Sequence, residues 1–191
     1  MIFYIMGKSA SGKDSLYKRL ISSNLNLNRL AIYTTRPKRD GEEEGVEYYF
    51  VDKKFLDDNA SKIIEKRVYH TVFGDWYYAT LDDGKISEDK NYIVIGTLES
   101  YNHIKKYYGE EKVYPIYIEA DDAIRRERAI HREKLQKVPK YDEMERRLKA
   151  DDIDFSEENL KFANIKKRYN INDLETCLNE VIKDIREILH D

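Results

Sequence analysis

A short loop bounded by glycines near the start of the chain constrains the fold most strongly. The segment Gly7-Lys8-Ser9-Ala10-Ser11-Gly12-Lys13 follows the apolar run of residues 2–6 and precedes a helical pattern over residues 14–22. Glycines at both ends let the backbone curl so that successive N–H groups point inward, and the helix adds its positive end. Lys13 adds a mobile ammonium for the outer phosphates of a nucleoside triphosphate. We interpret the segment as a phosphate-binding loop; a Gly/Ser turn that only caps the helix is the simpler alternative.

This loop and the first helical turn supply the candidate ATP-binding residues, which are Gly7, Ser9, Ala10, Ser11, Gly12, Lys13, Asp14 and Ser15. The pattern departs from its consensus at one position, because Asp14 stands where Ser or Thr normally holds magnesium. Ser15 follows directly. We therefore expect Ser15 or a water molecule to replace the missing hydroxyl at the Mg²⁺ ion.

Length and charge narrow the class of protein. With 191 residues, the chain is long enough for one sizeable core, so we expect a single domain spanning residues 1–191. The 34 Lys and Arg residues nearly balance 37 Asp and Glu residues, which gives no general case for a nucleic-acid or membrane-surface partner. No apolar run approaches the roughly 20 residues that span a bilayer, and no signal peptide is evident, so we expect a cytoplasmic protein. The single cysteine, Cys177, lies on the apolar stripe of a helical pattern and is expected in the core.

Strand-like runs alternate with helical patterns along most of the chain. The strands are expected at residues 2–6, 30–33, 92–95, 113–119 and 169–171; the helices at residues 14–22, 98–108, 121–133, 141–150, 156–163 and 173–190. Such alternation predicts crossover units and a parallel sheet, with ligands beyond the carboxyl ends of its strands. Residues 34–89 break the rhythm, since they are rich in charge, Tyr and Gly and alternate like small antiparallel strands. We expect them to form an inserted lobe over the nucleotide site.

The start of this lobe carries a second candidate phosphate site. Arg36 and Arg39 flank Pro37, which keeps the backbone extended, and guanidinium donors suit a phosphate bidentately. Taken alone, the segment is more typical of a solvated charged loop. Beside a phosphate-binding loop the balance reverses, because an enzyme that transfers phosphate holds the charge of its acceptor as well as that of its donor.

The segment resembles the guanylate kinases of the nucleoside monophosphate kinase group. The matching residues are Thr34-Thr35-Arg36, Arg39, Gly41-Glu42, Gly45 and Glu47-Tyr48, and Tyr77-Tyr78-Ala79-Thr80 is similar to a second family motif, with Ala in place of Gly. The resemblance covers most of the chain. It implies that Arg36, Arg39, Tyr48 and Tyr78 bind the phosphate of an acceptor monophosphate, and that Thr80 belongs to the same monophosphate-binding site.

Arginines on the helical pattern at residues 121–133 form a further candidate group. Arg125, Arg128 and Arg132 are spaced three and four residues apart, so they share one helix face. Such a stripe is usually a solvated surface, but phosphoryl transfer depends on cationic clamping. Residues 128–147 resemble the lid of these kinases. The resemblance assigns Arg128, Arg132 and Arg147 as catalytic residues together with Lys13, with Arg146 as the substitute for Arg147.

The family residues that recognise the bases of the donor and acceptor nucleotides are only partly matched in this sequence. Asn172 corresponds to the residue that meets the donor adenine in the family, although a turn or cap role is equally compatible. The family recognises guanine with a Ser, a Glu and an acidic pair. Here Ile32, then Val68 or Tyr69, and finally the stretch Gly96-Thr97-Leu98-Glu99 stand at those positions. Glu65 or Glu99 are the carboxylates left for the guanine edge, but their spacing does not establish this.

Together these observations predict a three-layer α/β P-loop kinase fold with a parallel central sheet. Its core spans residues 1–33 and 90–191, its monophosphate-binding lobe about residues 34–89 and its lid about residues 128–147. The resemblance implies transfer of the ATP γ-phosphoryl group to GMP or dGMP, with Mg²⁺ as cofactor and small-molecule nucleotides as partners. Two alternatives stay open: a kinase for another nucleoside monophosphate or small phosphorylated acceptor, and a non-catalytic guanylate-kinase-like binding domain. The sequence does not indicate an oligomeric state.

Overall fold

The apolar strand-like runs form a five-stranded parallel sheet at the centre of the molecule. The computed structural model describes residues 1–39, 41–71 and 74–190. The strand order is β2 (Leu27–Arg29), β7 (Asn91–Ile95), β1 (Ile2–Met6), β8 (Val113–Glu119) and β9 (Arg168–Asn170). Every neighbouring pair in this sheet is parallel, as the crossover pattern predicts.

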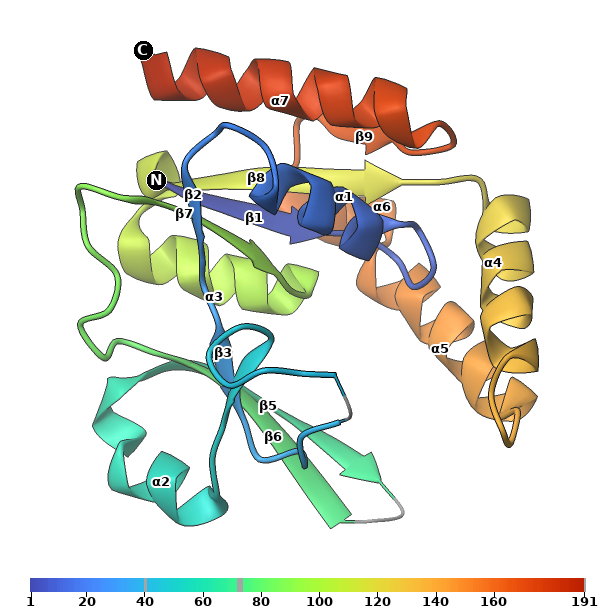
Figure 1. Cartoon of the computed structure of the whole chain (residues 1–191), viewed down its shortest axis with the longest axis horizontal. Coiled ribbons are helices and arrows are strands. Elements are labelled where there is room, and N and C mark those ends of the chain that lie inside the picture. Colours follow the sequence, from blue (N-terminus) through green and yellow to red (C-terminus); the bar gives the residue numbers. More distant parts are fainter. Residues whose placement is uncertain (40, 72–73, 191) are drawn as a thin grey trace.

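Helices cover both faces of this sheet and make three layers (Figure 1). On one face lie α1 (Lys13–Ile21) and α7 (Leu174–His190), and on the other lie α3 (Leu98–Tyr108) and α6 (Glu157–Phe162). Cys177 is fully buried on the apolar stripe of α7, as expected. The short 3₁₀ helix η2 (Glu110–Lys112) leads into β8. The predicted three-layer fold with a parallel sheet is therefore confirmed.

A second, four-stranded sheet builds the inserted lobe, which lies below the central sheet in Figure 1. Its order is β4 (Tyr48–Phe50), β3 (Ile32–Thr34), β6 (Gly74–Leu81) and β5 (Ile63–Thr71); helix α2 (Lys53–Asp58) and the 3₁₀ helix η1 (Ala60–Lys62) complete it. The antiparallel strands expected here are present in the β5–β6 and β3–β6 pairs, whereas β3 and β4 are parallel. Helix α2, capped by the Asp52 carboxylate on the N–H of Phe55 at 2.7 Å, had no counterpart among the expected elements.

The prediction of one continuous strand at residues 30–33 is wrong. The Leu30 N–H donates to the Ile93 carbonyl oxygen in the central sheet at 3.0 Å, and from Ile32 onward the chain pairs with β4 and β6 of the lobe. One apolar run thus contributes residues to both sheets. Hydrophobicity alone does not show the break between them.

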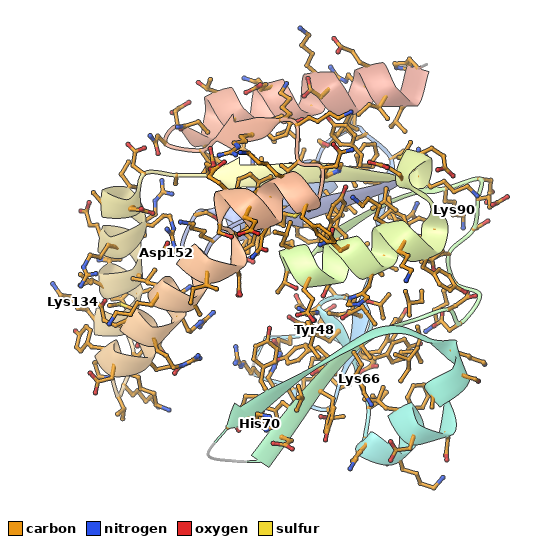
Figure 2. The ribbon with its side chains drawn as sticks, turned by 180° about the vertical axis from the view of Figure 1, so that it is seen from behind. Tyr48, Lys66, His70, Lys90, Lys134 and Asp152 are labelled. Atoms are coloured by element: carbon orange, nitrogen blue, oxygen red, sulfur yellow. The ribbon has the colours of Figure 1, made fainter. Side chains whose placement is uncertain are left out.

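Two helices project from the carboxyl edge of the central sheet. They are α4 (Asp122–Lys134) and α5 (Tyr141–Asp154), which contact each other and include the predicted lid, residues 128–147 (Figure 1). An ion pair between Arg126 and Glu145 links them. Figure 2 shows Asp152, near the end of α5, beside the central sheet, and Lys134, at the end of α4, far from it. No helix in the described part of the chain is long and apolar enough to cross a membrane.

Candidate active site

The phosphate-binding loop connects β1 to α1 at the carboxyl edge of the central sheet. Its backbone takes left-handed φ angles at Ala10 (59°) and at Gly12 (107°), the residue that precedes the first turn of α1. Gly7 is needed for space, since a Cβ there would lie 2.4 Å from the Ile118 carbonyl oxygen. The loop therefore passes closely over β8. Its curl, which the glycine spacing predicted, leads directly into the N-terminus of a helix.

Two arginines of α4 hold this loop by its carbonyl groups. Arg125 Nε donates to the Ser9 carbonyl oxygen at 3.1 Å, and Arg128 Nη1 donates to that of Ser11 at 2.8 Å. Arg125 is almost completely buried and also contacts Asp122 at 2.5 Å. Sequence analysis placed Arg125 on the arginine face but gave it no role. Its burial next to Ala129, one turn along α4, is the feature that only packing reveals.

An aspartate of α5 occupies the polar groups of Ser9. Asp151 Oδ2 accepts from the Ser9 N–H at 2.7 Å, and Asp151 Oδ1 accepts from the Ser9 hydroxyl at 3.2 Å. Arg125 Nη2 lies 3.2 Å from the same carboxylate, and the neighbouring Asp152 pairs with Lys8 Nζ at 2.7 Å. Sequence reasoning missed Asp151, since it lies 142 positions from its partner. The contact couples the position of α5 to the shape of the loop.

Lys13 is largely buried and lies among side chains of both charges. Burial of its ammonium is the largest cause that lowers the pKa of Lys13, and the nearby charges of Arg147 and Arg132 lower it further. The carboxylates of Asp14 and Asp151 oppose this shift. Lys13 Nζ lies 3.5 Å from the Lys8 carbonyl oxygen, inside the curl of the loop. A buried ammonium group is stabilised in its charged form when an anion binds beside it.

The structure distinguishes between the two neighbouring arginines of α5. Arg147 and Arg132 line a small cavity together with Ser9. Arg146 instead makes two 2.7 Å contacts with Glu143 on its own helix. Of the two, Arg147 is the one turned toward the loop. Arg132 and Arg147 are both exposed, so their guanidinium groups are accessible to a ligand.

The remaining candidate donor-site residues lie at the rim of the loop. Asp14 and Ser15 are exposed in the first turn of α1. Asn172 is exposed in the turn between β9 and α7, where its Oδ1 accepts from the Asp121 N–H at 3.2 Å. The structural role that the sequence left open for Asn172 is thus present, and contact with an adenine ring stays a prediction.

In the lobe, Arg36 lies inside a cage of aromatic rings. Its guanidinium carbon is 5.3 Å from the Tyr48 ring centre and 5.7 Å from that of Phe50, and its side chain is only 3% exposed. Nη2 donates to Glu42 Oε1 at 2.6 Å, and Nη1 donates to the Pro37 carbonyl oxygen at 2.7 Å. Burial alone would lower the pKa of Arg36, but hydrogen bonds with Glu42 and Tyr78 raise it. The Arg36 charge is therefore fixed by the surrounding fold and does not belong to a solvated loop.

The other predicted acceptor residues differ in their position relative to this cage. The Tyr48 and Tyr78 rings meet edge to face at 5.6 Å, and Tyr48 also packs against the core beside α3 (Figure 2). Arg39 is exposed, and its backbone N–H donates to Glu42 Oε2 at 2.7 Å. Thr80 is buried and donates its hydroxyl to Glu65 Oε1 at 2.9 Å. Arg36, Tyr48 and Tyr78 are therefore in contact, whereas Thr80 faces a different group.

A phosphate-binding loop between β1 and α1, two helices at the carboxyl edge of a parallel sheet and an inserted lobe are the arrangement typical of P-loop nucleotide kinases. The chain belongs to the guanylate kinase family, whose model matches residues 2–183. The guanylate kinase of Helicobacter hepaticus is 34% identical over 136 residues, which cover 69% of this chain and 66% of that protein. The guanylate kinase of Porphyromonas gingivalis is 29% identical over 199 residues, which cover 98% of this chain and 97% of that protein.

A solved structure supports the fold. The crystal structure of guanylate kinase from Anaplasma phagocytophilum matches 98% of this chain and 85% of that chain, with a TM-score of 0.64 and 21% identity. The chain spans just under two thirds of the Helicobacter relative and nearly all of the Porphyromonas one.

Proposed function

We propose that the protein transfers the γ-phosphoryl group of ATP to a nucleoside monophosphate, with GMP or dGMP as the acceptor. The observation that carries this proposal is the presence of two separate cationic sites in one fold. Lys13 lies in the phosphate-binding loop among cations of the lid, and Arg36 lies in the lobe within an aromatic cage. A binding module would need only one of these sites, whereas a phosphotransferase needs a site for each substrate.

The donor side acts by positioning and by charge. We assign the N–H groups of Gly7, Ala10 and Gly12 to the phosphates of ATP, with Lys13 next to them at the start of α1. The N–H groups of Ser9 and Ser11 are bonded to Asp151 Oδ2 and to the Lys8 carbonyl oxygen, so they join this set only when those bonds are exchanged for phosphate. Arg128 supports the loop from behind through the Ser11 carbonyl oxygen. Arg132 and Arg147 are accessible and close to Lys13, so they are suited to the charge that develops on the transferred group.

The acceptor side uses the lobe. Arg36 and Arg39 provide guanidinium donors for the acceptor phosphate, and the hydroxyl groups of Tyr48 and Tyr78 complete its ligands. The Glu42 carboxylate, bonded to both the Arg36 side chain and the Arg39 backbone, keeps this segment in shape. No covalent intermediate is needed, because alignment of the two nucleotides brings the acceptor oxygen to the γ-phosphorus.

Mg²⁺ is the expected cofactor. Asp14 and Ser15 supply a carboxylate and a hydroxyl from consecutive positions in the first turn of α1, and oxygen ligands of this kind suit magnesium. The ion would neutralise donor phosphate charge. We further propose a cytoplasmic location, where these nucleotides are available.

A panel of monophosphates tests the function directly. Purified protein with Mg²⁺ and ATP is assayed for ADP release with GMP, dGMP, AMP, CMP and UMP. We expect the highest kcat/KM with GMP or dGMP. Highest activity with another acceptor would transfer the proposal to that substrate, and the absence of transfer to all five would support the non-catalytic binding domain instead.

A further inference from the structure

The phosphate-binding loop contains a left-handed residue that is not glycine. Ala10 has a φ of 59°, two positions before Gly12 at 107°. Glycine occupies this region readily, whereas the Cβ of alanine disfavours it, so the surrounding fold has to hold Ala10 there. Rotation of the peptide plane between Ser9 and Ala10 changes ψ of Ser9 and φ of Ala10. The conformation of Ala10 therefore depends on what holds this one peptide group.

Arg125 holds this peptide group by its carbonyl. Arg125 Nε donates to the Ser9 carbonyl oxygen at 3.1 Å. The described residues contain no cis peptide bond, so the Ser9 carbonyl and the Ala10 N–H point in opposite directions. With the carbonyl directed at Arg125 on α4, the Ala10 N–H points away from that side chain and makes no hydrogen bond to any residue that the structure describes. This N–H is therefore a donor left for an anion.

Arg128 makes the same kind of contact two positions further along the loop. Its Nη1 donates to the Ser11 carbonyl oxygen at 2.8 Å, and the Gly12 N–H of that peptide likewise has no partner within residues 1–39, 41–71 and 74–190. The two peptide groups differ in what their conformation costs. Gly12 adopts a positive φ without a Cβ, whereas Ala10 depends on the contact with Arg125.

The guanidinium of Arg125 is fully engaged with protein atoms. Its side chain is 4% exposed, and each of its three nitrogens bonds an oxygen: Nε that of the Ser9 carbonyl, Nη1 that of Asp122 at 2.5 Å and Nη2 that of Asp151 at 3.2 Å. Asp151 also accepts from the Ser9 N–H at 2.7 Å. Two oppositely charged side chains thus fix both backbone groups of Ser9. Arg125 acts on the loop through its backbone and not as a phosphate ligand.

We propose that Arg125 is a positioning residue for the phosphoryl donor: by fixing the Ser9–Ala10 peptide, it keeps Ala10 left-handed and directs the Ala10 N–H at a phosphate of ATP. This inference rests on the proposed function, in which the loop binds ATP. Without Arg125 the peptide turns over and Ala10 relaxes to a negative φ. A carbonyl oxygen then faces the phosphate in place of the N–H, and the two repel each other.

The readout is direct binding of Mg²⁺-ATP to the full chain, measured by isothermal titration calorimetry without an acceptor. We expect Arg125→Met to raise the Kd of ATP about tenfold, because one N–H contact to a charged phosphate is lost. The KM for GMP at saturating ATP should stay the same. Arg126→Met is the matched control, since it removes an exposed arginine of α4 and its ion pair with Glu145. It should bind ATP as the wild type does. An unchanged Kd in Arg125→Met would overturn the proposal.

Ala10→Gly separates positioning from packing. In the Ala10→Gly background a left-handed φ needs no support, so Arg125→Met should raise the Kd of ATP by only about twofold there. A role of Arg125 in packing alone would act equally in both backgrounds, because the glycine does not replace the lost partner of Asp151. Equal Kd ratios in the two backgrounds would therefore overturn the proposal.

Arg125→Lys keeps the test open if Arg125→Met does not fold. It retains a positive charge between Asp122 and Asp151 but loses the planar fork, so the Kd of ATP should again rise about tenfold. Wild-type affinity in this variant would refute the inference. Circular dichroism and the melting temperature verify that each variant is folded. If the wild type binds ATP but phosphorylates no monophosphate, the proposed function fails and the Kd values still decide the role of Arg125. Absence of ATP binding by the wild type would overturn both.

Discussion

Replacement of Arg36 by Ala tests two consequences of one buried guanidinium. The side chain is 3% exposed and donates at 2.6 Å to Glu42, whose side chain is 16% exposed. Loss of a charge-assisted contact to a bound phosphate costs about 1.5–3 kcal/mol, or roughly a tenfold to hundredfold rise in the KM for the monophosphate. Loss of the partner of Glu42 should also destabilise the fold by about 1–3 kcal/mol, which corresponds to a fall of about 2–12 °C in melting temperature.

Arg39→Ala separates binding from stability. Arg39 is exposed, so we expect the same rise in the KM for the monophosphate but a change in unfolding free energy within about 0.5 kcal/mol. The KM for ATP should stay the same in both variants. Lys38→Ala, an exposed neighbour in the same segment, is the matched control and should resemble the wild type. Steady-state kinetics with each substrate varied and thermal melting supply the measurements. If both arginine variants phosphorylate the best acceptor as well as the parent does, the anion-site interpretation of this segment is refuted.

Three further predictions concern the donor site and the effect of pH. Lys13→Ala should lower kcat by about two to three orders of magnitude with the melting temperature unchanged, and near-normal turnover would contradict the phosphate-loop assignment. Asp14→Ser should keep activity but change the Mg²⁺ dependence of ATP affinity, measured by titration at several Mg²⁺ concentrations; an identical dependence would leave Asp14 as a helix-terminus residue only. The hydrogen bond from Arg36 holds the pKa of Glu42 below its usual value of 4.5, so this pair stabilises the fold above about that pH and the contribution is lost as the pH falls further. Denaturant titration of Glu42→Gln should therefore show a flatter acid limb than the wild type, and an unchanged limb would rule out the linkage.

Local signals explain why much of the fold was predictable. The phosphate-binding loop depends on residues within seven positions of one another, and the apolar runs that flank it are continuous in sequence. The break after Arg29 and the short helix α2 escaped prediction for the opposite reason. Each depends on which sheet lies nearby, and periodicity carries no such information.

The residues of the donor site also differ in whether local spacing could predict them. Spacing identified Lys13 and the arginines of α4, because residues three and four apart share a helix face. It did not identify Asp151, whose carboxylate meets Ser9 only when α5 folds back on the loop. Arg125 bonds the Ser9 carbonyl oxygen and the Asp151 carboxylate, so helices α4 and α5 and the phosphate-binding loop form one hydrogen-bonded unit.

Long-range pairing also explains why base specificity could not be argued from the sequence. By spacing, the family's Ser, Glu and acidic positions carry other residues here, and Glu65 and Glu99 are the two carboxylates that the sequence leaves open. In the structure Glu65 is bonded to Thr80 and Ser100, 15 and 35 positions away, whereas Glu99 is exposed at the first turn of α3. The pairing of Glu65 with Thr80 depends on the register of the β5–β6 hairpin, which spacing along the chain does not show. A count of positions from the Tyr77-Tyr78-Ala79-Thr80 motif therefore does not identify the residue that faces it, because the length of the hairpin also decides which residues lie opposite each other.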